Sequence, residues 1–316
     1  MKKLLSAAFA VMMTASLFAG CGTTSGSSEA PQTAGSAAVS SSAESAKPED
    51  KSSDFDGSRP INVVSREEGS GTRGAFIELT GIEEKQPDGK KVDNTTKEAI
   101  IANKTDVVLT NVAGDDYAIG YVSLGSLNST VKALAVDGAE ATAENVKNGT
   151  YKIARPFNIA TKGEPTGLAA DFISFIMSAE GQEVVEKNGY IKVDDAAAPY
   201  AGTKPEGKLV IAGSSSVTPV MEKLVEAYKA LNAAATIEVQ QSDSTAGMTA
   251  AIDGTCDIGM ASRELKDSEA AALKATAIAN DGIAVITSVN NPASAITKET
   301  IKEIFTGKVE TWDQVQ

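Results

Sequence analysis

The sequence predicts an α/β protein in which mainly parallel sheets are flanked by helices. Strand-like and helix-like segments alternate from Lys208 onward, which is the pattern of parallel strands joined by helical crossovers. The earlier part of the chain repeats this alternation more loosely, from Ile61 to Val122. The length of 316 residues gives room for two domains of ordinary size.

The second half of the chain carries the clearer alternation. Apolar residues recur at helical spacing from Val217 to Leu231, and a short helix capped by Thr297 is expected at Lys298–Phe305. The expected strands of this half are Leu209–Ala212, Thr236–Val239, Asp257–Ala261 and the nearly all-apolar Gly282–Ser288, and the other expected helices are Val217–Leu231, Thr245–Asp253 and Leu265–Ala277.

The first half gives weaker signals. Gly167–Asn188 is expected to form a helical pair broken near Gly181, and Tyr151–Ala160 is expected to be extended because Pro156 restricts the backbone. The remaining expected elements are strands at Ile61–Ser65, Asp106–Leu109 and Ala118–Val122, helices at Thr72–Leu79 and around Lys97–Ala102, and a polar loop at Gly81–Asn94.

Residues 1–20 have the layout of a secretory signal. Lys2 and Lys3 precede an apolar core, Leu4–Phe18, which is too short for a stable transmembrane helix. The Ala-Gly pair before Cys21 resembles a bacterial lipobox, so Cys21 is expected to become the lipidated N-terminus. The alternative is an ordinary secreted protein that is cleaved nearby.

Residues 21–57 are predicted to form a flexible tether. Their composition is rich in Ser, Ala, Gly, Thr and acidic residues, with almost no large apolar side chains, so the segment cannot bury enough surface to fold. Such a segment would hold a folded domain away from a membrane. No later part of the sequence reads as a membrane span.

Composition argues against several function classes. The net charge of −13 disfavours nucleic-acid binding, and no basic cluster offsets it. The chain has no His, which excludes Ser-His-Asp and Cys-His catalysis and removes the commonest transition-metal ligand. We expect no catalytic residue, cofactor or metal site. Cys256 is interpreted as a small buried core residue.

Two loops of small residues carry the strongest functional signal. They are Arg66–Arg73, with the sequence REEGSGTR, and Gly213–Pro219, with the sequence GSSSVTP. Each follows a strand-like run and precedes a helix-like run, so hydroxyls and free backbone N–H groups gather at a helix N-terminus, which favours oxyanions. Gly69–Gly74 also fits the dinucleotide pattern G-x-G-x-x-G, but no second strand ending in an acidic ribose ligand follows it.

Two further segments have related chemistry. Ser244–Gly247 is a hydroxyl-containing helix start, which by itself is more typical of an N-cap. Ala261–Leu265 places Ser262 and Arg263 after a predicted strand, where the ligands of open α/β sheets collect. Arg263 alone is typical of a surface charge, but as part of a fourth loop it is a candidate bidentate partner for phosphate.

These segments together resemble the phosphate-binding lipoproteins of bacterial phosphate ABC transporters, which are type II periplasmic binding proteins. The resemblance covers essentially everything after the tether. It implies a Venus-flytrap of two α/β lobes, joined by two crossing strands, with a dehydrated anion between them. The matching runs are Ser65–Arg73, Ala118–Ser123, Ser178–Gln182, Gly213–Pro219, Asp257–Leu265, Asp281–Ile286 and Ile304–Lys308.

The order of the segments departs from that family. The Gly213 loop ordinarily opens the mature domain, and the Ser65–Arg73 loop ordinarily follows the segment that here ends the chain. The resemblance therefore implies a circular permutation in which Asp194–Gly207 bridges the old termini; the alternative is a chain cut from two tandem copies. The implied lobes are 153–289 and 58–152 plus 290–316, with crossings near Ile153–Pro156 and Ser288–Asn290.

The resemblance also implies a set of ligand-binding residues. Some larger family members have an Asp at the position of Ser262, where it accepts a hydrogen bond from protonated phosphate and rejects sulfate. The substitute acceptors in this chain would be Asp243, Glu264 or Glu68, and Glu68 could instead pair with a neighbouring arginine. The implied phosphate ligands are Ser215, Ser216 and Ser244 from one lobe and Arg66, Ser70, Gly71 and Thr72 from the other, with Ser262 and Arg263 beside them.

The sequence thus predicts a monomeric extracytoplasmic receptor that is lipid-anchored through Cys21 to the outer face of the cell membrane. It would bind inorganic phosphate by lobe closure and deliver it to the permease subunits of an ABC transporter, with no catalytic step. The alternatives are a receptor for another tetrahedral oxyanion such as sulfate, and a surface sensor or adhesin on the same scaffold. A phosphatase with Ser215 or Ser70 as nucleophile is disfavoured by the lack of His and of an evident metal cluster.

Overall fold

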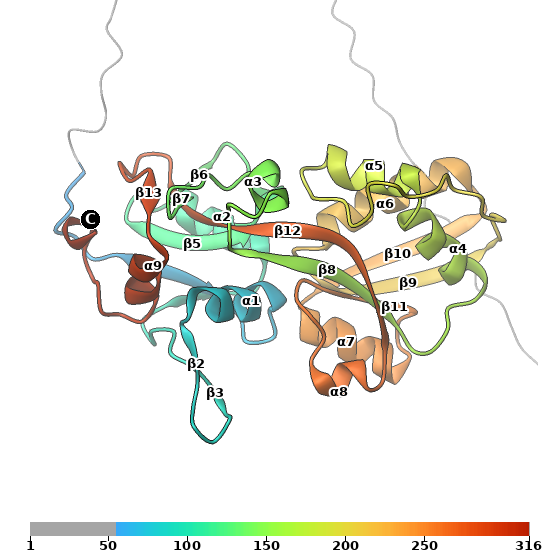
Figure 1. Cartoon of the computed structure of the whole chain (residues 1–316), viewed down its shortest axis with the longest axis horizontal. Helices are drawn as coiled ribbons and strands as arrows, with labels where there is room; N and C mark the ends of the chain where they lie inside the picture. Colours follow the sequence, from blue (N-terminus) through green and yellow to red (C-terminus); the bar gives the residue numbers. More distant parts are fainter. Residues whose placement is uncertain (1–54, 316) are drawn as a thin grey trace, which may run out of the picture. The chain divides into compact units, whose positions relative to one another are not determined.

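A mixed sheet of nine strands runs through the computed structural model, which describes residues 55–315 (Figure 1). The strand order is β10-β9-β11-β8-β12-β5-β1-β4, and β6 pairs with β12. The strands are β1 Asn62–Arg66, β4 Ile100–Ala102, β5 Ala118–Ser123, β6 Val131–Ala133, β8 Ala154–Thr161, β9 Gly207–Ser214, β10 Ala235–Ser242, β11 Ile258–Ala261 and β12 Lys274–Ser288.

Parallel pairing dominates both ends of the sheet, and antiparallel pairing joins them. Strands β10, β9 and β11 are parallel, as are β5, β1 and β4. Between these groups, β8 is antiparallel to both β11 and β12, and β12 is antiparallel to β5. The predicted α/β fold, with parallel sheets joined by two crossing strands, is confirmed.

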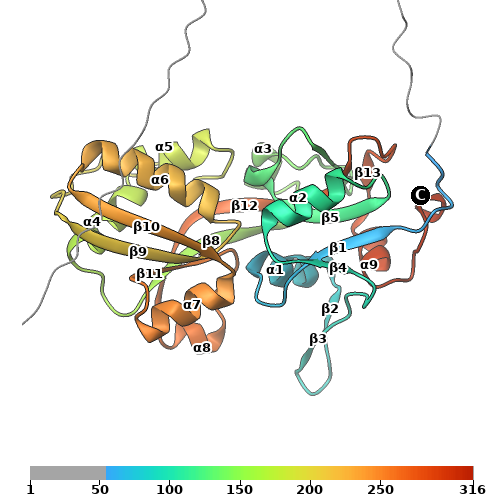
Figure 2. The ribbon, with the colours of Figure 1, turned by 180° about the vertical axis from the view of Figure 1, so that it is seen from behind.

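Helices cover both faces of the sheet. In Figures 1 and 2, α5 and α6 lie on one side of β9, β10 and β11, and α7 and α8 lie on the other. No helix in residues 55–315 is long and apolar enough to cross a membrane. The helices are α1 Gly71–Thr80, α2 Thr105–Ala113, α3 Ala143–Lys147, α4 Gly167–Ile176, α5 Ala179–Lys187, α6 Thr218–Leu231, α7 Ser244–Asp253, α8 Asp267–Ala270 and α9 Lys298–Phe305, with 3-10 turns η2 Leu124–Ser126 and η3 Trp312–Gln314.

The buried apolar residues form two groups of clusters that meet along β12. One group draws on residues 157–279, including Ile278 and Ala279, and the other on residues 61–153 and 283–312, including Ile283 and Val285. The change along β12 therefore falls at Asp281 and Gly282, earlier than the crossing expected near Ser288–Asn290. The lobe boundaries themselves stay a prediction.

Local capping explains where the helices next to the functional loops begin. The Ser70 side chain accepts a hydrogen bond from Arg73 N at 3.2 Å, and Gly81 ends α1 with a φ of 74°. The expected cap of α9 is confirmed, since the Thr297 side chain accepts a bond from Thr300 N at 3.0 Å.

Three of the elements predicted from the sequence are wrong. Residues 100–102 of the expected helix around Lys97–Ala102 form β4, which pairs in parallel with β1, and the expected strand Asp106–Leu109 lies inside α2. Short apolar runs do not distinguish a strand from a buried helix, and tertiary pairing decided both cases. Most of the expected helix Leu265–Ala277 is not helical, because from Lys274 onward the chain pairs with β8.

Two smaller expectations also need correction. The polar loop expected at Gly81–Asn94 contains a hairpin of β2, Glu83–Lys85, and β3, Lys91–Asp93. The break in the helical pair falls at Ser178, which caps α5 by accepting a bond from Gly181 N at 3.3 Å. A second small sheet pairs β7, Ala135–Val136, with β13, Ala295–Ile296.

The two ends of the described chain are paired with each other. Ile61 N donates to Glu310 O at 2.7 Å, and Asp313 N donates to Gly57 O at 2.8 Å. Pro60 and Thr311 form an antiparallel bridge between these bonds. The chain therefore enters and leaves the fold at one place.

We expect the chain to tolerate a change in the position of its ends. A protein in which Val315 is linked to Ser58 and the chain is opened between the exposed Ala196 and the half-buried Ala197 should keep a cooperative thermal transition, within about 2 kcal/mol of the parent. Opening the same joined chain between the buried residues Ala284 and Val285 is the control that should not fold. A first variant without a cooperative transition contradicts the expectation.

Candidate functional site

Seven buried hydroxyl side chains gather where the ends of β9 and β11 meet the starts of α1, α2 and α7. One of them, Ser214, is the last residue of β9, and Thr72 and Thr105 lie in the first turns of α1 and α2. We call this group the hydroxyl cluster: Thr72, Thr105, Ser214, Ser215, Ser216, Ser244 and Ser262, each at most 5% exposed.

Hydrogen-bond distances across the hydroxyl cluster join residues far apart in the sequence. Thr72 Oγ1 lies 2.8 Å from Ser216 Oγ and 3.2 Å from Ser262 Oγ. Thr105 Oγ1 lies 3.2 Å from Ser215 Oγ and 3.3 Å from Ser216 Oγ. The starts of α1 and α2 are thereby held against the loop that follows β9.

The serines within the cluster also bond to one another. Ser214 Oγ donates to Ser262 Oγ at 3.0 Å, and Ser262 N donates to Ser244 Oγ at 3.1 Å. The loop geometry depends on Gly213, whose φ is 135° and where an added Cβ would lie 2.4 Å from Met260 O. The glycine lets β9 approach β11 closely enough for Ser214 and Ser262 to meet.

A second close approach brings the α1 loop against the start of α7. Gly69 O accepts bonds from Thr245 N at 3.2 Å and from Thr245 Oγ1 at 3.1 Å. A Cβ on Gly71 would lie 2.4 Å from Ser244 Oγ, closer than real Cβ contacts allow. Glycine at this position is what permits the two loops to touch.

Arg66 brings a buried guanidinium to the cluster. Its Nη2 donates to Ser215 Oγ at 3.0 Å, and its Nη1 donates to Thr105 Oγ1 at 3.3 Å. The same guanidinium donates to both carboxylate oxygens of Glu67 at 2.7 Å. Arg66 N donates to the Tyr121 hydroxyl at 3.1 Å, which fixes the end of β1, and burial raises the pKa of Tyr121. The site thus has a cation whose charge is already paired.

The guanidinium of Arg263 lies outside the hydroxyl cluster. Its two terminal nitrogens donate to the Glu269 carboxylate at 2.7 and 2.9 Å, and one also donates to Thr245 Oγ1 at 3.2 Å. Burial opposes ionisation of Glu269, but bonds from Arg263 and from Lys266 N outweigh it, so the pKa of Glu269 is lowered. Arg263 therefore holds the start of α7, and its predicted bidentate contact with phosphate is not what this geometry favours.

The remaining predicted residues have more local roles. Ser70 caps α1, and Asp243 caps α7 by accepting from Ala246 N at 2.8 Å. Glu68 and Glu264 are exposed. None of the three carboxylates proposed as substitute acceptors is hydrogen-bonded to the hydroxyl cluster in the described part of the chain. Cys21 lies outside the described residues.

Sequence reasoning missed two residues of the site. Thr105 was missed because the segment after it was expected to be a strand, so its place at a helix start went unrecognised. Arg155 lies on β8 and donates from Nη2 to Thr72 Oγ1 at 3.0 Å. A single arginine beside Pro156 matches no binding motif. The one signal that could have found it is the presence of a cation on a strand that is otherwise largely apolar.

Comparison with known proteins shows the family. Residues 48–180 and 198–316 match the model of the PBP superfamily domain. The Phosphate-binding protein PstS 2 of Streptococcus agalactiae serotype V is 57% identical over 257 residues, which cover 81% of this chain and 87% of the relative. The chain belongs to this family of phosphate-binding proteins. The family resemblance predicted from the sequence is confirmed.

Other relatives fit this assignment to different extents. The PstS 2 protein of Streptococcus pneumoniae serotype 4 is 48% identical over 256 residues, and the crystal structure of a phosphate-binding protein of a phosphate ABC transporter from that species covers 81% of this chain and 100% of its own, with a TM-score of 0.65. The PstS protein of Bacillus subtilis is 35% identical but aligns over only 43% of this chain and 42% of its own length.

We expect Gly71→Ala to separate the two loops. The added methyl group would overlap Ser244 Oγ, which costs about 1–3 kcal/mol if the contact is kept. Amide hydrogen exchange of Thr245, whose N–H donates to Gly69 O, should therefore be about tenfold faster. Gly74→Ala in the same helix is the matched control, because its nearest neighbouring atom would be 3.9 Å away. Unchanged protection of Thr245 in Gly71→Ala contradicts this account.

Proposed function

We propose that this protein is an extracytoplasmic receptor that binds inorganic phosphate and delivers it to the permease of an ABC transporter. The observation that carries the proposal is the convergence of Arg66 with hydroxyls from the starts of α1 and α2 and from the ends of β9 and β11. Membership of a family whose relatives are phosphate-binding proteins supports the choice of ligand.

The proposed binding chemistry relies on local dipoles. A net charge of −13 repels anions at long range, and Glu67 already pairs with Arg66, so the site has little excess positive charge. Hydroxyl groups and the free N–H groups of a first helical turn donate to an oxyanion without adding net charge. Several such donors acting together replace the hydration that phosphate loses in a buried site.

The proposed ligands come from both of the proposed lobes. Thr105 joins the sequence-based set because its hydroxyl accepts a bond from Arg66 and lies within hydrogen-bond distance of Ser215 Oγ. Arg263 is assigned to support of the α7 loop. No catalytic step is assigned to any of these residues. The proposed ligands are Arg66, Ser70, Gly71, Thr72 and Thr105 on one side and Ser215, Ser216, Ser244 and Ser262 on the other.

The proposal includes two lobes that close on the anion. The sequence-based lobes are 153–289 and 58–152 plus 290–316. We move the second crossing to Asp281–Gly282, where β12 changes its packing, so residues 283–289 join the second lobe. Support comes from the separate core clusters on either side of that point. Contacts such as Arg66 to Ser215 and Gly69 to Thr245 then belong to the closed form.

Calorimetric titration of the chain without its signal segment tests this function. Phosphate should bind with micromolar or tighter affinity, and solution scattering of the same samples should show a smaller radius of gyration on binding. Arg66→Ala should weaken binding roughly 30-fold or more, because it removes a buried charged donor. Arg59→Ala is the control, since Arg59 stacks on Tyr117 and takes no part in the cluster. A folded protein that binds neither phosphate nor sulfate contradicts the proposal.

A second candidate is a receptor for tetrahedral oxyanions in general, sulfate included. The observation that favours it is that Asp243, Glu68 and Glu264, the three candidate acceptor carboxylates, are not hydrogen-bonded to the hydroxyl cluster in the described part of the chain. A hydroxyl can donate as well as accept, so it does not repel an anion that lacks a proton. Equal affinity for phosphate and sulfate in the titration would select this candidate.

Anchoring through a lipid on Cys21 is also part of the proposal, and it rests on the sequence alone. We expect the full chain to stay with the membrane fraction after cell lysis. A Cys21→Ser chain whose residues 1–20 are replaced by a conventional cleaved secretion signal should be released, because both the apolar segment and the lipid acceptor are then lost. Equal distribution of the two proteins would contradict lipid anchoring at this residue.

Circular permutation completes the proposal. The adjacency of Gly57 to Asp313 supports it, since an older chain could have run directly between these residues. The Bacillus subtilis relative aligns over less than half of either chain, as a difference in segment order would produce. The variant in which Val315 is linked to Ser58 and the chain is opened after Ala196 tests whether the fold tolerates the other order of segments. Retained phosphate binding by that variant would show that the function tolerates it too.

A further inference from the structure

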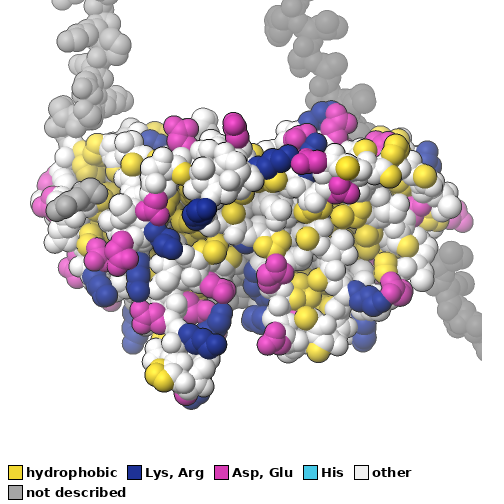
Figure 3. Space-filling model, in the orientation of Figure 1, with side chains coloured by type: hydrophobic (Ala, Val, Ile, Leu, Met, Phe, Trp, Pro, Cys, Tyr) yellow, Lys and Arg dark blue, Asp and Glu magenta, His cyan; other side chains and the backbone are white. Residues whose placement is uncertain are grey.

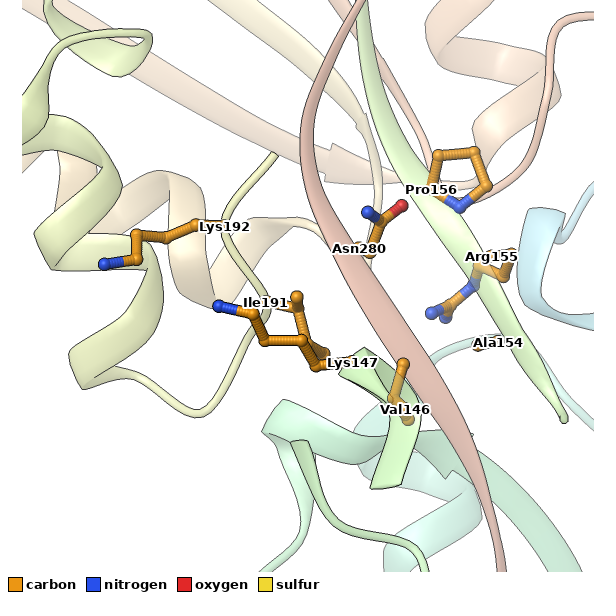
Figure 4. A pocket seen from close by; sticks show the side chains of 8 residues that line it. All are labelled: Val146, Lys147, Ala154, Arg155, Pro156, Ile191, Lys192 and Asn280. Carbon is orange, nitrogen blue, oxygen red and sulfur yellow. The ribbon is translucent and has the colours of Figure 1, made fainter. Parts of the chain in front are cut away.

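A buried ion pair lies beside the hydroxyl cluster. Arg155 on β8 and Asp281 on β12 are direct neighbours across the antiparallel pair, and their side chains are 3% and 0% exposed. Arg155 Nη1 donates to Asp281 Oδ2, and Gly125 N donates to Asp281 Oδ1 at 3.3 Å. Figure 4 shows Arg155 on β8 with its guanidinium directed toward β12. The pair occupies the strands that join the two groups of core clusters.

Stability alone is a poor account of this pair. Removing two charges from water costs several kcal/mol per ion, and apolar residues of similar volume often stabilise a protein as well or better. Burial raises the pKa of Asp281 even though the Arg155 charge acts in the opposite direction. Arg155 Nε is buried and has no hydrogen-bond partner among the described residues, so one of the N–H donors of this arginine is left unpaired.

Arg155 makes one bond that leads into the proposed binding site. Its Nη2 donates to Thr72 Oγ1 at 3.0 Å, and that oxygen lies 2.8 Å from Ser216 Oγ. A hydroxyl has two acceptor lone pairs and one proton. When the guanidinium occupies a lone pair of Thr72, the proton of Thr72 is left to point at another acceptor in the cluster.

The pocket next to the pair is a weaker candidate for a separate anion site. It has a volume of about 390 Å³ and is lined by Arg155, Lys147 and Lys192 (Figure 4). Lys147 is paired with Asp195 at 2.9 Å, and Lys192 with Glu186 at 2.9 Å. The positive charges that line this pocket are therefore already paired with carboxylates. The bond from Arg155 to Thr72 remains as the feature that distinguishes Arg155 from the two lysines.

We propose that Arg155 is a positioning residue of the oxyanion site. Asp281 holds the guanidinium in place, and the guanidinium orients the Thr72 hydroxyl so that its proton donates to the bound anion. The inference rests on the proposed function of the cluster. Because the charge of Arg155 is balanced by Asp281, its contribution passes through the Thr72 hydroxyl.

A double-mutant cycle in the chain without its signal segment tests the inference. Arg155→Gln/Asp281→Asn removes the pair without leaving a buried charge, and Thr72→Val removes the hydroxyl while keeping its shape. Losing one hydrogen bond to a charged group corresponds to roughly tenfold weaker phosphate binding. We expect Arg155→Gln/Asp281→Asn to weaken phosphate binding by this factor when Thr72 is present, and by less than twofold in the Thr72→Val protein. Each of the four proteins is titrated with phosphate past half saturation. An equal loss in both backgrounds, or no loss in either, overturns the inference.

Two further variants keep the test decisive. If the Arg155→Gln/Asp281→Asn protein does not fold, Arg155→Lys replaces it, because one ammonium keeps the charge but lacks the guanidinium fork that serves Asp281 and Thr72 together. Full affinity in Arg155→Lys then overturns the inference. Arg263→Gln/Glu269→Gln is the matched control. It removes a second, largely buried pair, and its effect should be the same in both Thr72 backgrounds.

The inference and the function on which it rests fail in different ways. An unchanged chain that binds neither phosphate nor sulfate overturns the proposed function and this inference with it. An unchanged chain that binds phosphate, together with additive losses in the cycle, overturns the positioning role and leaves the receptor function standing.

Discussion

The antiparallel pairing of β8 with β12 is the constraint on which the rest of the structure depends. The two strands are paired from Lys274 and Thr161 to Gly282 and Ala154, and β12 then continues beside β5. One continuous strand thereby belongs to both parts of the sheet. Its course sets the starts of α1 and α2 opposite the ends of β9 and β11, and the hydroxyl cluster forms where they meet.

The chemistry of the hydroxyl cluster follows from the position of its neutral hydroxyl groups between two ion pairs. Arg66 is balanced by Glu67, and Arg155 by Asp281, so neither arginine leaves an uncompensated charge in the interior. The hydroxyls between them can donate or accept as a ligand requires. In the proposed function, a buried oxyanion would then be recognised by the directions of its hydrogen bonds, in a protein whose overall charge repels it.

Elements with strong local signals were predictable, and those decided by distant pairing were not. Helix α6 has apolar residues at helical spacing, and β5 and β9 lie close to their expected positions. The 100–102 segment became a strand because β1 offers it an edge, and the start of β12 became one because β8 does. The same limit applied to the site, since misplacing α2 concealed Thr105.

The sequence by itself determined which loops are candidates for binding an oxyanion, because capping by Ser70 and the clustering of serines after β9 are effects of neighbouring residues. Tertiary structure alone decided which of those groups meet. It brought Arg66 to Ser215 and Arg155 to Thr72, and it set Gly71 against Ser244. These contacts join residues far apart along the chain, and their distances depend on how β8 and β12 place whole elements, which no local pattern encodes.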